Sequence, residues 1–310
     1  MRQKLVVPAV AAGLLFLAAC DFEDFNFNGE RYSRDFHYSF PLKPNGRLTV
    51  ESFNGSIEIS GWDQDSVDIS GTKYGPTQER ADDLKIETGN TPDSVSVRAI
   101  RPSERRNNQG ARFVIKIPRS TLLDRITTSN GSIRTLDGAG PARLRSSNGS
   151  IRVEDLRGSV DAQTSNAAVD LIGVEGDVVA HSSNGHIHAE GLRGGFDAST
   201  SNASVKAEIT RASRPVRVET NNGSVELALA AEISGDVRVN TSNAGITVRL
   251  PSSTNARVLA RTSNSSISSD FDLKVHGEIG KNHMDGAIGS GGGPLIDLAT
   301  SNGGIRLMKM

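Results

Sequence analysis

Two kinds of side chain in this 310-residue sequence have the chemistry for a specific site: one thiol and a group of three imidazoles. Cys20 is the only cysteine, so no disulfide can form within the chain. His186 and His188 are two residues apart, which on a strand puts both on one face, and His181 precedes them. Imidazoles bind Zn²⁺ or Cu²⁺, so the three are candidate metal ligands. The pattern favours the simpler interpretation, exposed polar residues at variable positions of a repeat.

The residues before Cys20 indicate the fate of its thiol. A short basic start is followed by an apolar run over residues 5–17 and by two alanines. This is the pattern of a secretory signal that is too short to span a membrane as a stable helix. The tetrapeptide Leu17-Ala18-Ala19-Cys20 resembles the lipobox of bacterial lipoproteins, which implies removal of residues 1–19 and acyl chains such as palmitate on Cys20. We therefore expect a lipid anchor in the cell envelope, at the outer membrane or the periplasmic face of the inner membrane.

Residues 20–35 have no helical or strand periodicity, and we interpret them as a lipidated tether. The whole chain has 35 Lys and Arg residues against 36 Asp and Glu residues. This near-neutral balance argues against a nucleic-acid partner, which would need a basic face to meet phosphates. Abundant glycine, scarce aromatic residues and the lack of a long helical pattern point to an all-β protein.

An internal repeat must position the remaining polar residues. A Ser-Asn pair, a small residue and a strand-like apolar pattern recur at intervals of eighteen residues, which places asparagines at Asn130, Asn148, Asn166, Asn184 and Asn202. Looser copies occur at Asn54, Asn222, Asn243, Asn264 and Asn302. We expect the asparagine side chains to stack in a hydrogen-bonded structural ladder, while the following Gly or Ala accepts a tight turn.

The apolar positions inside each repeat predict the fold. Apolar side chains occur three and five residues after the asparagines at 148, 166, 184, 202, 222 and 243, and again twelve and fourteen residues after those at 148, 166 and 184. Two short strands whose apolar faces stack on the next coil explain this alternation. We predict an all-β, single-stranded parallel β-solenoid (a β-helix) over residues 36–310, with coils of roughly 18–21 residues. Residues 74–118 break the pattern, and we interpret them as an N-terminal β insertion or capping sheet.

The outward positions of the repeat offer no catalytic group. The residue four positions after each asparagine is Arg134, Arg152, Asp170, His188 or Lys206 in successive coils. β-Helices that cut polysaccharides gather carboxylates on one face, whereas charges of alternating sign are typical of a solvated face with weak pairing between coils. We therefore predict no catalytic residue and no cofactor. A polysaccharide-active β-helix enzyme is an alternative that a cluster of acidic side chains would support.

Several segments together match a known pattern: residues 51–63 (ESFNGSIEISGWD), the Ser-Asn-Gly-Ser-Ile copies, and the closing segments 291–295 and 300–305. They resemble a family of bacterial envelope domains of unknown function, the putative adhesins, over the chain from about residue 40 to the end. The resemblance implies a β-solenoid at the cell envelope and supplies no catalytic residue.

These observations predict a non-catalytic cell-envelope lipoprotein that displays a β-solenoid for adhesion, binding or scaffolding. The expected partners are the membrane, through the N-terminal lipid, and an envelope polymer or surface protein. A further alternative is a self-assembling structural envelope protein, in which solenoid ends associate end to end.

Overall fold

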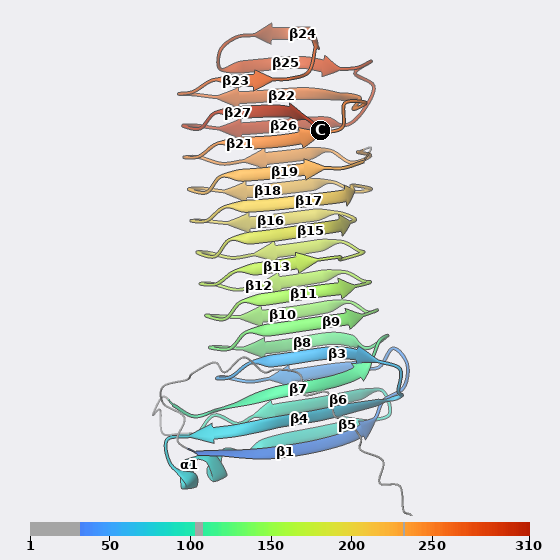
Figure 1. Ribbon diagram of the computed structural model, residues 1–310, viewed down its shortest axis with the longest axis vertical. Coiled ribbons are helices and arrows are strands. Elements are labelled where there is room, and N and C mark those ends of the chain that lie inside the picture. The colour runs from blue at the N-terminus through green and yellow to red at the C-terminus, as the bar shows by residue number, and fades with distance from the viewer. Residues whose placement is uncertain (1–31, 103–107, 232) are drawn as a thin grey trace, which may run out of the picture.

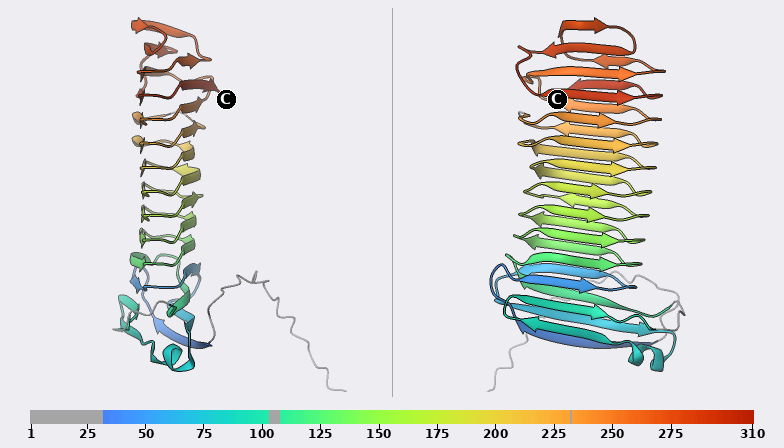
Figure 2. Two further views of the ribbon diagram at one scale, coloured as in Figure 1. Left: turned by 90° about the vertical axis from the view of Figure 1, so that its left-hand side faces the viewer. Right: turned by 180° about the vertical axis from the view of Figure 1, so that it is seen from behind.

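The computed structural model describes residues 32–102, 108–231 and 233–310 of the chain. Within these residues the chain winds back and forth between two facing sheets, and the stacked coils form a flat rod (Figures 1 and 2). Sheet A has 13 strands and sheet B has 14. The predicted signal, Cys20 and most of the predicted tether lie outside the described residues, so the lipid anchor stays a prediction.

Each regular coil contributes one strand to sheet B and then one strand to sheet A. The sheet B strands are β8 (Leu122–Thr128), β10 (Ala142–Ser146), β12 (Val160–Gln163), β14 (Val178–His181), β16 (Phe196–Thr200), β18 (Val216–Thr220) and β20 (Val237–Asn240). The sheet A strands are β9 (Ile133–Gly138), β11 (Ile151–Leu156), β13 (Val169–Ile172), β15 (Ile187–Arg193), β17 (Val205–Arg211), β19 (Val225–Leu229) and β21 (Ile246–Leu250).

The core forms because equivalent residues of successive coils pair in register. Ile151 pairs with Val169, and both side chains are fully buried between the sheets. The residues between the inward positions face outward, as the period-two pattern requires. Register partners are eighteen residues apart at Ile151 and Val169 and twenty-one apart at Val225 and Ile246. The predicted fold class, an all-β parallel solenoid, is confirmed.

At the N-terminal end, coils do not stack in the order of the sequence. The coil formed by β2 (Arg47–Glu51) and β3 (Ile57–Trp62) lies between the regular coils and a coil formed by β6 (Ser94–Ala99) and β7 (Gly110–Pro118). Antiparallel strands then close this end, β4 (Ser66–Gly75) and β1 (Tyr32–Pro41) on sheet A and β5 (Ile86–Thr91) on sheet B. Residues 74–118 also contain α1 (Gln78–Asp83), which begins after the N-cap Thr77 and lies at the end of the rod (Figure 1).

The C-terminal end shows the same departure from sequence order. The chain first forms β22 (Ala256–Thr262), β23 (Ile267–Ser269) and an antiparallel pair, β24 (Leu273–Ile279) and β25 (His283–Ile288). It then returns to form β26 (Leu295–Thr300) and β27 (Ile305–Lys309) one coil deeper in the stack. In Figure 1 these two strands lie below β22 and β23, although they follow them in the chain.

Asparagine side chains form a continuous ladder along one edge of the rod. The side-chain nitrogen of Asn148 donates to the side-chain oxygen of Asn130 at 2.6 Å, and Asn166 donates to Asn148 at 2.7 Å. Asn184 and Asn202 continue the ladder with bonds of 2.8 Å. In spatial order the ladder runs through Asn54, Asn130, Asn148, Asn166, Asn184, Asn202, Asn222, Asn243, Asn302 and Asn264.

A column of buried hydroxyl groups lies behind the asparagine ladder, two residues before each ladder asparagine except Asn54. Thr164 Oγ1 donates to the carbonyl oxygen of Gly149 at 2.9 Å, and Ser182 Oγ donates to that of Ala167 at 3.1 Å. Both side chains are at most 1% exposed. Each hydroxyl therefore satisfies a carbonyl group of the neighbouring coil that would otherwise be buried without a partner. The recurring Ser or Thr at this position was visible in the sequence, but only its partner in the next coil reveals its role.

Replacing Asn166 with alanine removes one bond that it donates and one that it accepts. We expect the free energy of unfolding to fall by about 1 kcal/mol, since the ladder is exposed and each hydrogen bond contributes a modest net amount. Urea unfolding followed by circular dichroism measures the change. Asn240→Ala is the matched control, because Asn240 lies on β20 and its side chain makes no hydrogen bond in the described structure. Equal losses in the two variants would contradict the ladder's contribution.

Two buried threonines should respond in opposite directions to the same substitution. Thr135 Oγ1 is buried with no hydrogen-bond partner, at a position where the neighbouring coils have Ile59 and Val153. We expect Thr135→Val to raise the free energy of unfolding by about 1 kcal/mol, because it removes an unsatisfied polar group. Thr164→Val should lower it by a similar amount, because it leaves the carbonyl of Gly149 without its donor. Parallel urea titrations test the signs, and a loss in both variants would overturn the interpretation of Thr135.

Candidate functional site

The outer face of sheet A carries charged residues that pair between neighbouring coils. Glu154 on β11 accepts hydrogen bonds from Arg152 on the same strand and from Arg134 on β9, the latter at 3.1 Å. Burial tends to raise the pKa of Glu154, but the hydrogen bonds and charges of the two guanidinium groups outweigh it and lower the pKa below its usual value. These three side chains are therefore already paired with one another.

Sheet B and one edge of the rod show the same internal pairing. On sheet B, Asp297 lies 3.4 Å from Arg238 and 3.2 Å from Arg261, so one carboxylate links three strands. Along the edge, Glu175 lies 3.8 Å from Arg157 and 3.1 Å from Arg193. Such exposed pairs each contribute little to stability. They do neutralise much of the surface, and they leave carboxylates beside arginines rather than beside other carboxylates.

The structure separates the three candidate histidines. His181 is on β14 of sheet B, where its Nδ1 lies 2.6 Å from Ser199 Oγ. His186 and His188 flank the buried Ile187 on the sheet A side, and His188 Nε2 lies 3.9 Å from Glu190. Outward side chains of the two sheets point away from each other across the core, so His181 cannot join the other two. No group of three or more His, Cys, Asp or Glu residues suited to a metal ion occurs in the described part of the chain.

The repeat spacing concealed this separation. His181 and His186 are only five residues apart, but the turn that contains Asn184 lies between them and carries the chain from sheet B to sheet A. Period-two alternation assigns a side chain to the inside or outside of a coil and does not say which sheet it faces. Assigning alternate strands of each coil to opposite sheets would have excluded the three-histidine site.

A shallow hollow of about 460 Å³ interrupts the outer face of sheet A between β15 and β21. It exists because β19 presents Ala228 outward and Ala230 directly follows the strand, whereas the register partners of Ala228 on the neighbouring strands are the longer Glu208 and Arg249. The two small side chains therefore leave a depression, which Met310 also lines. The sequence signal was the pair of alanines at outward positions, which a search for catalytic groups passes over.

Charged groups of both signs surround the alanine floor. Glu226 lies 3.6 Å from Arg249, while Lys206 and Glu208 on β17 form no ion pair in the described structure. Glu190 and Glu208 follow the register partners Ala189 and Ala207, at the point where the register of β15 and β17 shifts, so both carboxylates line the hollow from neighbouring strands. The hollow thus combines a small apolar floor with one cation, Lys206, and one carboxylate, Glu208, that form no ion pair in the described part of the chain.

Comparisons with known proteins find likeness only at the level of solved structures. No family model matches the chain, and no curated protein matches it. A crystal structure of a putative cell adhesion protein from Clostridium sporogenes ATCC 15579 is 13% identical, covers 89% of this chain and 100% of its own, and has a TM-score of 0.31. A putative adhesin from Bacteroides fragilis NCTC 9343 is 15% identical, covers 89% of this chain and 97% of its own, and has a TM-score of 0.41.

The descriptions of the two neighbours, a cell adhesion protein and an adhesin, apply to those proteins. In addition, none of the helices in the described residues is long and apolar enough to cross a membrane. What this chain binds must therefore be argued from its own surface.

The charge cluster at Glu154 predicts a specific pH dependence. Because the folded-state pKa of Glu154 is lowered, its stabilising contribution is complete above the unfolded-state pKa and is lost as the pH falls through the folded-state pKa. We expect Glu154→Gln to be less stable than the unsubstituted chain at neutral pH, with the difference closing in acid. Thermal unfolding over a pH series measures this. Glu87→Gln serves as the control, since Glu87 is exposed on β5 without an ion pair; a difference that stays constant into acid would contradict the assignment.

Proposed function

We propose that this chain is a non-catalytic bacterial envelope lipoprotein, anchored through a lipid on Cys20, that displays its β-solenoid for adhesion, binding or scaffolding. The observation that carries the binding role is the hollow on sheet A. There Ala228 and Ala230 occupy outward positions and leave a concavity. Lys206 and Glu208 line it and form no ion pair in the described part of the chain.

The hollow's composition suggests the kind of partner. Its floor of Ala228 and Ala230 accepts a small apolar group. Around the floor, Lys206 can bind an anionic group, and the carboxylates of Glu190 and Glu208 can bind cationic or hydroxyl groups. A segment of an envelope polymer or of a surface protein that carries both charges fits this arrangement. Charge complementarity of this kind contributes more to the choice of partner than to raw affinity.

The position of the hollow along the rod suits display. The predicted anchor at Cys20 precedes β1, which is the first strand of sheet A in spatial order, whereas β15 is the eighth and β21 the eleventh. With strands about 4.8 Å apart, the hollow lies roughly 35–50 Å along the rod from β1. A stack of in-register coils is stiff, so it would hold a binding surface away from the membrane without a further domain.

The test is a retention assay with the chain in which Cys20→Ser prevents lipidation, using isolated envelope polymers and membrane proteins as separate fractions. We expect saturable retention by one fraction, and a loss of about tenfold or more in affinity for the double variant Lys206→Ala, Glu208→Ala, equivalent to roughly 1.4 kcal/mol. Filling the floor with Ala228→Arg should weaken retention as well, because it removes the concavity.

The matched control is Arg217→Ala, Glu219→Ala on β18. These two residues are also outward, two positions apart and without ion pairs in the described part of the chain, but they lie on sheet B and do not line the sheet A hollow. If this pair weakens retention as much as the sheet A pair does, general surface charge is responsible and the hollow is not the site. Breakdown of a polymer fraction, in place of retention, would favour the polysaccharide-active alternative.

A further inference from the structure

The coil formed by β26 and β27 occupies a place that its order in the sequence would not give it. β26 pairs in parallel with β20 on one side and with β22 on the other. β27 likewise lies between β21 and β23. The chain has therefore passed over one level of the stack, built the next coil and its antiparallel cap, and returned to fill the gap (Figure 1).

The gap accepts only a coil that carries the repeat. Ile296, Leu298, Ile305 and Leu307 face inward and are at most 1% exposed, so they complete the core between the two flanking coils. Asn302 donates to Asn243 at 2.8 Å and accepts a bond from Asn264 at 2.7 Å, and so bridges the asparagine ladder. An empty gap would expose the apolar and backbone groups of two coils to water, which is unfavourable.

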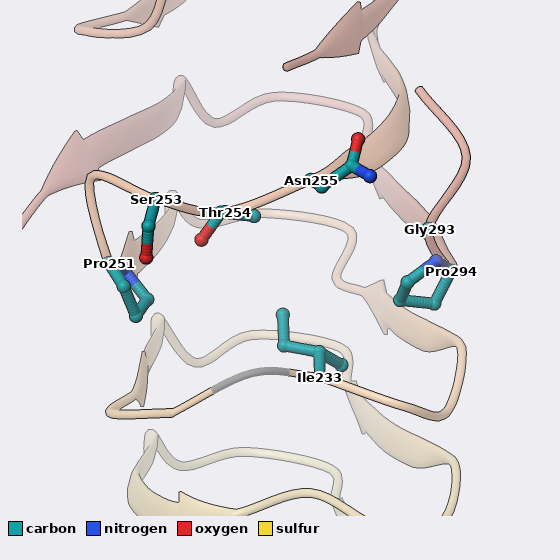
Figure 3. Close-up of a pocket in the computed structure, with 7 residues that line it drawn as sticks. All are labelled: Ile233, Pro251, Ser253, Thr254, Asn255, Gly293 and Pro294. Atoms are coloured by element: carbon teal, nitrogen blue, oxygen red, sulfur yellow. The ribbon is translucent and has the colours of Figure 1, made fainter. Parts of the chain in front are cut away.

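A glycine-rich linker is the covalent connection between this coil and the strands before it. Residues 289–294 read GSGGGP, and Gly289 and Gly291 have φ angles of 67° and 77°. The side-chain oxygen of Asn255 holds the linker by accepting bonds from Ser290 Oγ at 3.1 Å and from the backbone nitrogen of Gly291 at 2.8 Å. Beside it lies a cavity of about 230 Å³ that extends from Gly293 and Pro294 to Ile233 (Figure 3).

We propose that the coil of residues 295–310 is exchangeable, and that a second copy of this chain inserts its own coil into the gap to form a reciprocally swapped dimer. Every strand pairing, core contact and ladder bond of the coil is the same whichever copy supplies it, and only the path of the linker differs. Six residues can extend to about 20 Å, which allows the linker to leave its place on Asn255 and cross to a neighbour.

The protein concentration during folding determines whether the monomer or the swapped dimer forms. A short flexible linker gives the chain's own coil an effective concentration in the millimolar range, so dilute protein folds as a monomer. Crowding of copies during folding favours exchange. Once formed, the swapped dimer persists on dilution, because its separation requires four strands to leave the sheets.

Cysteine pairs that report which copy fills the gap provide the test, in the full chain with Cys20→Ser. Thr247 and Arg306 are outward register partners on β21 and β27, and neighbouring strands lie about 4.8 Å apart, within the range that a disulfide bridges. One chain carries Thr247→Cys and a differently sized second chain carries Arg306→Cys. The two are refolded together over a range of concentrations and oxidised.

We expect a disulfide-linked heterodimer whose share rises with concentration. Asn255→Ala should raise that share several-fold, because it releases the linker, whereas Ser253→Ala in the same turn should leave it unchanged. Arg134→Cys in place of Thr247→Cys is the cross-linking control, since β9 lies far from β27 in the stack. Asn240→Cys with Ala299→Cys repeats the test independently on sheet B, where these two residues are register partners.

The result that overturns the proposal is the absence of a cross-linked heterodimer with both cysteine pairs at every concentration, in protein that elutes as folded. Dimers that form without either cross-link would also overturn it, and would indicate that the rods associate without exchanging this coil.

Discussion

The structure depends on one constraint: no coil can bury its own apolar side chains, so each must lie in register on the next. A shift of a single residue would turn every inward side chain of a strand to solvent. The asparagine ladder and the hydroxyl column act on this register at one edge, because both join equivalent positions of successive coils. Core packing, backbone pairing and side-chain bonds thus all select the same alignment, which is how a sequence with few aromatic residues defines one fold.

The same constraint creates a difficulty at the ends, where the last coil has a neighbour on one side only. Both ends meet it by adding antiparallel strands, β1 and β4 at one end and β24 and β25 at the other, and by placing one coil out of sequence order. Each out-of-order coil ties a cap to the body through contacts on both of its faces. The end of the stack is therefore held by long-range pairing as well as by its own short strands.

The repeat predicted the inward positions and the ladder residues because both depend on spacing along the chain. It could not predict that Asn302 lies between Asn243 and Asn264, since a stack built from similar coils allows several spatial orders. Only tertiary pairing decides among them. The separation of His181 from His188 was also missed, because the period distinguishes inside from outside and does not distinguish the two sheets.

Functional information in such a molecule lies in departures from its repeat. Where the pattern holds, the outer faces largely pair their charges between coils, as Arg134 does with Glu154, and little binding capacity is left over. Ala228 and Ala230 and the glycine-rich linker before β26 are two departures from the pattern, one beside a hollow in a sheet and the other beside a cavity at the edge. In an otherwise consistent fold, a local break in the pattern marks a candidate site for binding a partner or exchanging a segment with it.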